Sequence, residues 1–177
     1  SSSMAFRPDL RIHGFLIVAL ALGGAVAAAP RVDSLAAAAE ALARGDGIAA
    51  EVAARKGLEA GAPPNEVAAL IGEAELLQGD LGDARRWLGP ADFSPATRER
   101  GFHALARLEM QEGDLAAAAE AFDKALQTGG GNARLWVDIG RLRYLAGQHH
   151  SVRDASARAL ALDPEDPRAL EFQAQLV

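Results

Sequence analysis

Apolar residues recur at steps of three and four along most of the chain after about residue 31. This spacing places them on one face of an α-helix. The amphipathic stretches come in pairs, and a glycine that recurs at a constant interval joins the members of each pair: Gly45, Gly79, Gly113 and Gly147. Because glycine lacks a Cβ and adopts positive φ easily, each glycine predicts a tight turn between two helices. We therefore expect an all-α chain of antiparallel helix hairpins with almost no sheet.

Small residues repeat in the same frame as the glycines. One series stands seven places before each glycine and the other five places after it: Ala38, Gly72, Ala106 and Gly140, then Ala50, Ala84, Ala118 and Val152. Small side chains let two helices approach closely, so these positions predict where the helices cross. Val152 is larger than its counterparts and predicts looser packing in the last hairpin.

The period divides the chain after residue 30 into units. Their boundaries contain prolines, glycines and helix-capping residues, which favour breaks between helices. The units are 31–64 (a degenerate first repeat), 65–98, 99–132 and 133–166, and residues 167–177 are the start of a fifth. Because terminal repeats normally have a polar outer face, we expect the fifth unit to be a truncated part of a longer array.

Residues 1–30 resemble a targeting segment. Arg7 and Arg11 precede an uncharged run from Gly14 to Ala29, the order of a secretory signal peptide, with cleavage expected after Ala27. A helix of this run rises about 24 Å, less than a bilayer core of roughly 30 Å. We therefore expect a periplasmic or secreted protein, and the alternative is an uncleaved inner-membrane anchor that leaves the chain facing the periplasm.

The third and fourth units contain the residues of a known repeat signature. The third has Phe102, Leu105, Ala106, Ala118, Phe122 and Ala125, and the fourth has Trp136, Ile139, Gly140, Tyr144, Ala159 and Pro164. This pattern resembles the tetratricopeptide repeat family, whose period of about 34 residues equals the spacing of the four turn glycines. The resemblance implies an α-solenoid, a right-handed superhelix of about four hairpins plus the first helix of a fifth. Arg143 at the family's Tyr position and Ser156 at a bulky position depart from the pattern.

The resemblance also implies a binding site, because the first helices of such units line a concave face where peptides bind. Carried onto this chain, that groove contains Arg100, His103, Arg107, Arg134, Val137, Arg141, Tyr144 and Arg168, with apolar positions Leu35, Leu42, Leu76 and Leu77 in the earlier units. The arginines form a basic stripe on a chain of net charge -6. Guanidinium groups suit carboxylates, so we expect a partner with acidic side chains or a free C-terminal carboxylate. Alternatively, the arginines pair with acidic residues on neighbouring turns.

Catalytic and cofactor chemistry is not indicated. The chain has no cysteine, no nucleotide-binding or hydrolase motif, and no third ligand near His149 and His150, so we expect no metal, no cofactor and no enzyme activity. Its acidic charge argues against nucleic acid. The carboxylates Glu73 and Glu75 are expected to be solvated, and His103 to be either a groove contact or a plain surface histidine.

These inferences favour a non-catalytic scaffold that binds a protein or peptide in bacterial envelope, secretion or polysaccharide assembly. Two alternatives remain open at this point: a docking arm of a longer enzyme whose catalytic domain follows Val177, and a membrane-anchored self-assembly module. Membrane contact is expected only through residues 1–30, if they are not cleaved.

Overall fold

The computed structural model describes residues 23–176, with side chains from Pro30 onward. Within this range the chain forms nine helices and no strand: α1 (Gly23–Ala43), α2 (Gly47–Glu59), α3 (Pro64–Gln78), α4 (Leu81–Leu88), α5 (Arg98–Glu112), α6 (Leu115–Gly129), α7 (Ala133–Leu145), α8 (His149–Leu162) and α9 (Pro167–Gln175). The expected all-α class is therefore confirmed.

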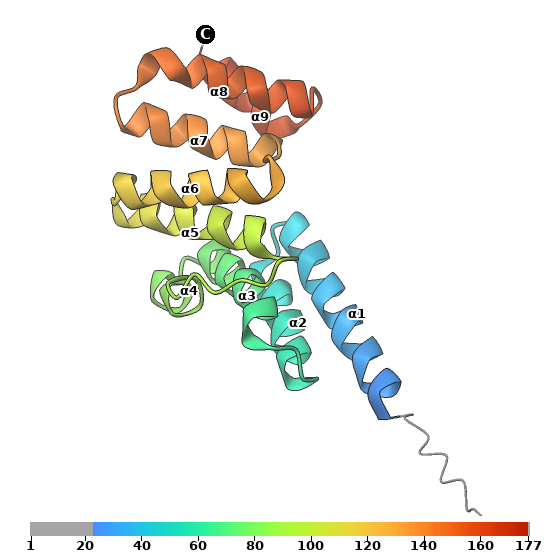
Figure 1. The fold of residues 1–177 in the computed structure, drawn as a ribbon. Coiled ribbons are helices and arrows are strands. Elements are labelled where there is room, and N and C mark those ends of the chain that lie inside the picture. The colour runs from blue at the N-terminus through green and yellow to red at the C-terminus, as the bar shows by residue number, and fades with distance from the viewer. Residues whose placement is uncertain (1–22, 177) are drawn as a thin grey trace, which may run out of the picture.

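Consecutive helices pair into hairpins that stack along one axis. Figure 1 shows α1 and α2 at one end of the stack and α8 and α9 at the other. The helices pack closely within the hairpins α1/α2, α5/α6 and α7/α8, α2 packs on α3 more extensively than α3 on the short α4, and α9 packs on α7 and α8. The array of four hairpins plus a fifth first helix agrees with the expectation, whereas its right-handed superhelix stays a prediction.

The turn inside each hairpin has the same backbone geometry. Gly45, Gly79, Gly113 and Gly147 have φ values of 76°, 81°, 87° and 73°, a left-handed conformation that residues with a Cβ rarely adopt. The N–H of Gly79 donates to carbonyls of the last turn of α3, and that of Gly113 does the same for α5. The prediction of tight glycine turns is confirmed.

An aspartate follows each of the first three turn glycines and caps the second helix. The side chains of Asp46, Asp80 and Asp114 accept hydrogen bonds from the backbone N–H three residues later, at 2.9, 3.0 and 2.9 Å. These N–H groups have no partner within the helix. Gln148 stands at the fourth position, and its side chain forms no cap hydrogen bond to the described part of α8.

Replacing Asp114 with alanine is expected to lower the free energy of unfolding by about 1 kcal/mol, because the first turn of α6 loses its cap. The matched change Gln148→Asp should raise it by a similar amount, since it supplies α8 with the cap that α6 has. Urea denaturation followed by circular dichroism measures both. Equal stability of the two variants and the parent would contradict the capping role.

The small residues of the repeat lie at the helix crossings. Ala50, Ala84 and Ala118 are fully buried, and Val152 is also buried. A Cβ at Gly72 would collide with the side chain of Leu88 in α4, and one at Gly140 would lie 2.5 Å from Cε1 of Phe172 in α9. Close packing therefore occurs at Gly72 and Gly140, whereas looser packing at Val152 stays a prediction.

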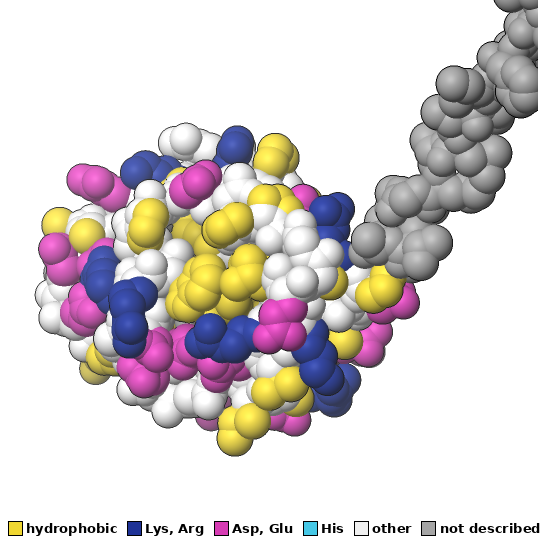
Figure 2. All heavy atoms as spheres, turned by 90° about the horizontal axis from the view of Figure 1, so that it is seen from below, with side chains coloured by type: hydrophobic (Ala, Val, Ile, Leu, Met, Phe, Trp, Pro, Cys, Tyr) yellow, Lys and Arg dark blue, Asp and Glu magenta, His cyan; other side chains and the backbone are white. Residues whose placement is uncertain are grey.

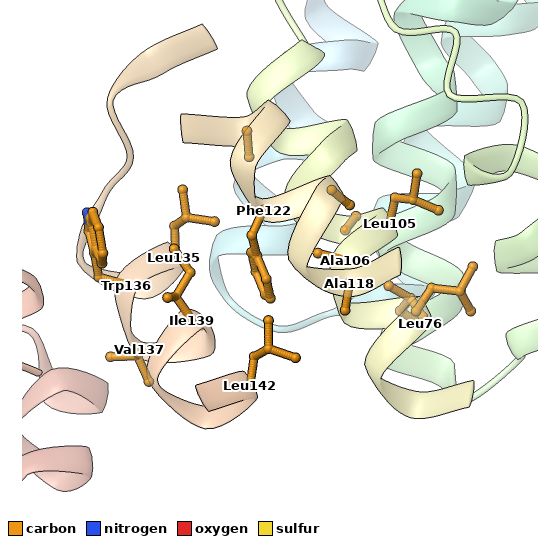
Figure 3. Close-up of a cluster of buried hydrophobic side chains, with 14 of the residues drawn as sticks. Leu76, Leu105, Ala106, Ala118, Phe122, Leu135, Trp136, Val137, Ile139 and Leu142 are labelled. Carbon is orange, nitrogen blue, oxygen red and sulfur yellow. The ribbon is translucent and has the colours of Figure 1, made fainter. Parts of the chain in front are cut away.

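Most of the apolar core lies in the second to fifth units. Figure 3 shows Phe122 of α6 pointing towards α7, where Leu135, Ile139 and Leu142 face it. Trp136 is buried on the same helix, and the guanidinium of Arg158 lies 4.7 Å from its ring centroid. Phe102 is half-buried against this cluster, and Lys124 lies over its ring. A smaller, alanine-rich cluster joins α1, α2 and α3. The family-like aromatic positions thus hold the third and fourth units together.

The first unit ends the stack with a partly apolar surface. Ile48 and Val52 of α2 are exposed. Figure 2 looks at this end from below, where apolar side chains in the middle are surrounded by basic and acidic ones. The mixed surface agrees with an end unit that lacks aromatic anchors.

Two segments differ from the expected unit boundaries. Helix α1 begins at Gly23 and continues through Pro30, so the boundary expected at residue 30 falls inside a helix. Helix α4 has only 8 residues, because Gly89 and Pro90 interrupt it. Phe93 in the following loop packs over Gly101, where a Cβ would meet its ring, and it therefore covers the surface that a longer α4 would cover.

The expected targeting segment falls largely outside the described residues. The structure begins to describe the chain at Gly23, after most of the apolar run. Among the helices that it describes, none has the length and apolar character needed to cross a bilayer. Signal peptide, cleavage and anchor all stay predictions.

Candidate binding face

Two buried carboxylates organise the surface formed by the first helices α3, α5, α7 and α9, which we call the first-helix face. The side chain of Glu73 in α3 and that of Asp138 in α7 belong to residues only 4% and 6% exposed. Glu75 is buried to the same degree as Glu73. The expectation that Glu73 and Glu75 are solvated is therefore wrong: both face neighbouring helices of the stack, not water.

Three arginines converge on Glu73. Arg100 Nη1 donates to Oε2 at 2.6 Å, and Arg134 Nη1 donates to Oε1 at 3.0 Å. Arg107 adds an ion pair at 3.7 Å. Burial alone would raise the pKa of Glu73, but the positive charges of Arg100, Arg134 and Arg107 outweigh it and hold the pKa below its usual value. The carboxylate is ionised at neutral pH and links three units.

Asp138 forms the second centre. Arg141 Nη1 donates to Oδ1 at 3.0 Å, His103 Nε2 lies 2.8 Å from Oδ2, and Arg107 is 3.8 Å away. An ionised carboxylate only accepts, so Nε2 of His103 donates. Burial would raise the pKa of Asp138, yet the hydrogen bond from His103 and the nearby arginines lower it. His103 is 9% exposed, so the expectation of a plain surface histidine is wrong.

In the network around Glu73 and Asp138, arginines outnumber carboxylates. Glu73 and Asp138 share Arg100, Arg107, Arg134 and Arg141. Arg168 is exposed and forms no ion pair with any residue from 30 to 176. Burial lowers the pKa of Arg107, and the positive charges of the nearby Arg134 and Arg168 lower it further. Both alternatives from the sequence are thus partly confirmed. The arginines lie together on one face, and four of them pair with carboxylates of the chain itself.

Two hollows flank this network. One, of about 240 Å³, is lined by charged residues that include Glu73, Glu99, Arg100, His103 and Arg134. The other, of about 470 Å³, lies between α5, α7 and α9 and is mostly apolar, with Met110, Tyr144, Leu145, Phe172 and Leu176 beside Arg141. The first-helix face therefore offers a charged hollow and an apolar one, connected through the arginine network.

The remaining expected groove residues separate into surface and core. Tyr144 is 59% exposed, with its ring edge-on to His149, and lines the apolar hollow. Val137 is 1% exposed, so its side chain belongs to the core and not to a binding surface. Leu42 and Leu76 are also buried. Leu35 and Leu77 are half-buried, and Leu35 lines a mostly apolar hollow of about 560 Å³ with Leu70 and Arg100. Apolar surface therefore lies at the first two units as well as at α5, α7 and α9.

One cluster of carboxylates within the described residues has oxygens close enough for a metal ion: Glu75, Asp80 and Asp83. Each of these carboxylates already forms an ion pair or a hydrogen bond within the chain. Glu75 pairs with Arg55 at 3.2 Å, Asp80 caps α4, and Asp83 pairs with Arg86. The arrangement is explained by helix structure and gives no reason to assign a metal.

Acid is expected to destabilise the chain through the two buried carboxylates. A carboxylate with a lowered pKa in the folded state stabilises it above its unfolded pKa, and the stabilisation is lost as the pH falls through the folded pKa. For Glu73 and Asp138 the unfolded values are about 4.5 and 3.8. The free energy of unfolding should therefore fall steadily below about pH 4.5. Thermal unfolding from pH 7 to 3 measures this, and Glu73→Gln should flatten the fall.

Comparisons with known proteins agree with the fold. Residues 109–176 match the family model described as tetratricopeptide repeat. A crystal structure of MamA protein superposes with a TM-score of 0.57 at 19% identity, covering 84% of this chain and 81% of that one. Over 103 residues, 58% of this chain, the sequence is 27% identical to BBSome complex member bbs-4 of Caenorhabditis elegans. The match spans 22% of that relative's length.

The stacked hairpins of residues 23–176 define a helical repeat fold. Residues 109–176 therefore resemble the tetratricopeptide repeat family, and the described part of the chain has a tetratricopeptide-like solenoid fold. Proteins of the tetratricopeptide repeat family are typically non-catalytic scaffolds.

Proposed function

We propose that this chain is a non-catalytic scaffold whose first-helix face binds an acidic segment of a partner protein. The observation that supports it is the excess of positive charge in the network around Glu73 and Asp138. Four arginines share these two carboxylates, and Arg168 adds a fifth guanidinium, which is exposed. A partner carboxylate near Arg134 and Arg168 would balance this charge. Guanidinium groups held by buried carboxylates are preorganised, which lowers the entropy lost on binding.

The apolar hollow beside Arg141 adds a second element of recognition. Met110, Tyr144 and Phe172 offer apolar surface next to the arginines, so a partner segment with an apolar side chain close to its acidic group fits the face best. The similarity to a BBSome complex member, a protein named for its place in a multiprotein assembly, supports a role in assembling other proteins. We place this role in the bacterial envelope, in secretion or in polysaccharide assembly, on the basis of the signal-peptide pattern.

Binding of a labelled acidic peptide tests the proposal. A fluorescein-labelled peptide of alternating glutamate and leucine should bind the parent, and its glutamine analogue should bind at least about tenfold more weakly. Affinity should fall as salt rises from about 0.05 to 0.5 M, since salt screens exposed charges. Fluorescence anisotropy measures both.

Arg168→Ala is the variant of choice, because Arg168 takes part in neither buried carboxylate centre. It should weaken the acidic peptide several-fold, whereas Arg153→Ala, which removes an exposed arginine from the second helix α8, should leave affinity unchanged. Equal affinity of both variants would show that the face does not bind acidic segments. The proposed compartment has its own test: secreted protein should begin near Ala28.

A further inference from the structure

The second helix of one unit and the first helix of the next meet along a groove that recurs in the stack: α2/α3, α4/α5, α6/α7 and α8/α9. The constant repeat period makes these grooves comparable position by position. One wall position is 51, 85, 119 or 153, and the facing position is 75, 109 or 143. A second wall position, one turn further along the second helix, is 55, 89, 123 or 157. The side chains at these three positions determine whether a groove is filled.

Charged pairs fill the first two grooves. Between α4 and α5, Arg85 donates two hydrogen bonds to Glu109, at 2.6 and 2.9 Å, and also contacts Glu112. Between α2 and α3, Arg55 donates to Glu75 at 3.2 Å, and Gln78 donates to Glu51 at 2.9 Å. In both, a glutamate of the first helix meets a side chain that reaches across from the second helix.

The third groove has the opposite composition. Ala119 stands at the register of Arg85, and Arg143 stands at the register of Glu109, so nothing reaches across. A cavity of about 350 Å³ remains, with apolar walls from Leu115, Phe122, Leu126, Ile139 and Leu142. Figure 3 shows how Phe122 faces Ile139 and Leu142 at this place. The α6/α7 groove is therefore an open hollow where the preceding grooves are closed.

Arg143 is the charged group of this hollow. It is half-buried, and its Nη1 donates to the backbone oxygen of Ser151 at 2.9 Å. It forms no ion pair with residues 30 to 176, unlike the arginines of the two earlier grooves. Asp123 lines the opposite wall, and its charge favours an anion on the α7 side only. A ligand for this hollow has an apolar body and one anionic group that reaches Arg143.

We propose that the α6/α7 groove is a second binding site, separate from the first-helix face, which takes the C-terminal residue of a partner polypeptide. A large apolar side chain such as leucine or phenylalanine lies against Leu115 and Leu126, and the terminal carboxylate pairs with Arg143. A chain terminus carries both groups on one Cα. An internal acidic residue would also bring peptide groups on both sides into a groove with few hydrogen-bonding partners, which costs desolvation.

The fourth groove supports this choice by contrast. It is also open, at about 390 Å³, but Ser156 and Gln173 stand at the registers of Phe122 and Ile139. Its walls are more polar, and the buried hydroxyl of Ser156 has no hydrogen-bond partner among the described atoms. Among the grooves that the structure describes, only the α6/α7 groove combines an open hollow, large apolar walls and an arginine that forms no ion pair with residues 30 to 176.

The test uses the acetylated peptide Gly-Ser-Gly-Leu-Leu with a free C-terminal carboxylate and the same peptide as a C-terminal amide. Methyl signals of Ile139 and Leu142 should shift on addition of the acid form, and the amide should bind at least about tenfold more weakly. Arg143→Gln should weaken the acid form by a similar factor. Arg168→Ala should leave it unchanged, which separates this site from the first-helix face.

A closing variant makes the test decisive. Ala119→Arg combined with Arg143→Glu recreates the pair Arg85 and Glu109 at matching positions, and Ala119 is exposed, so the fold should persist by circular dichroism and melting. Peptide binding should be lost. Equal binding of acid and amide, binding that survives in the closed variant, loss of binding in Arg168→Ala, or no methyl shift at about 5 mM peptide would each overturn the proposal.

Discussion

Replacing Phe122 with alanine is expected to lower the free energy of unfolding by about 4 kcal/mol, as large-to-small changes of buried aromatic residues do. Phe122 is among the largest fully buried side chains, and it packs between α5, α6 and α7 (Figure 3). Its ring also lies 6.0 Å from that of His103. The loss should therefore affect both the α5/α6 hairpin and its contact with the fourth unit. Urea denaturation followed by circular dichroism measures it.

Two controls define the origin of that effect. Phe122→Leu keeps most of the apolar volume and should cost less than half as much, whereas Leu162→Ala removes an exposed side chain and should change stability by less than about 0.5 kcal/mol. If Phe122→Ala were no more destabilising than Leu162→Ala, the ring would not join the two units.

Replacing Glu73 with alanine is expected to destabilise the chain by about 3 kcal/mol, because removing one partner of a buried ionic cluster leaves the other charges uncompensated. Here Arg100, Arg107 and Arg134 would face one another without an acceptor. The expected loss is smaller than for a fully buried pair, because the half-exposed side chain of Arg100 can rotate towards water. The midpoint of urea denaturation should fall at pH 7.

Glu73→Gln and Glu120→Ala serve as controls. Glutamine keeps the shape but not the charge, so it should lie between the parent and Glu73→Ala, and added chloride should partly restore its stability. Glu120 is an exposed carboxylate of α6, and its loss should have little effect. A Glu73→Ala chain as stable as the parent would mean that the arginines do not depend on this carboxylate.

Much of the fold can be predicted from the sequence, because the same pattern of turn and small residues recurs in each unit. The glycines at their constant interval predict the positive-φ turns, and the alanines at matching positions predict the helix crossings. The short α4 was not predictable from the period. There, Gly89 and Pro90 stop the helix, and Phe93 of the loop replaces its last turns over Gly101.

The site could be predicted in part. Arginines on first helices do come together, but the sequence reading missed their buried acceptors. The sequence contains a signal for each of the two buried carboxylates. Glu73 stands at the repeat position that Arg107 and Arg141 occupy in the next two units, with opposite charge. Asp138 stands at the repeat position of the buried Ala104. A charge reversed within a repeated stripe indicates an internal pair, and an aspartate at a core register indicates a buried one.

The contacts that long side chains make between units could not be predicted from the sequence. Arg134 contacts Glu73 across 61 residues, and no spacing rule selects that pair from several candidates. The closed α4/α5 groove and the open α6/α7 groove likewise differ only through which side chains reach across. Such contacts depend on helix separation, which the period alone leaves undetermined.

The bond between Arg134 and Glu73 skips a unit, because Glu73 belongs to the second hairpin and Arg134 to the fourth. Repeat arrays usually lengthen or shorten by whole repeats, since each contacts only its neighbours. Here an extra hairpin inserted after the third, or loss of the third, would break the charge balance. Adding or removing a repeat between these two residues would therefore separate Arg134 from Glu73, whereas adding one outside that span would leave the pair intact.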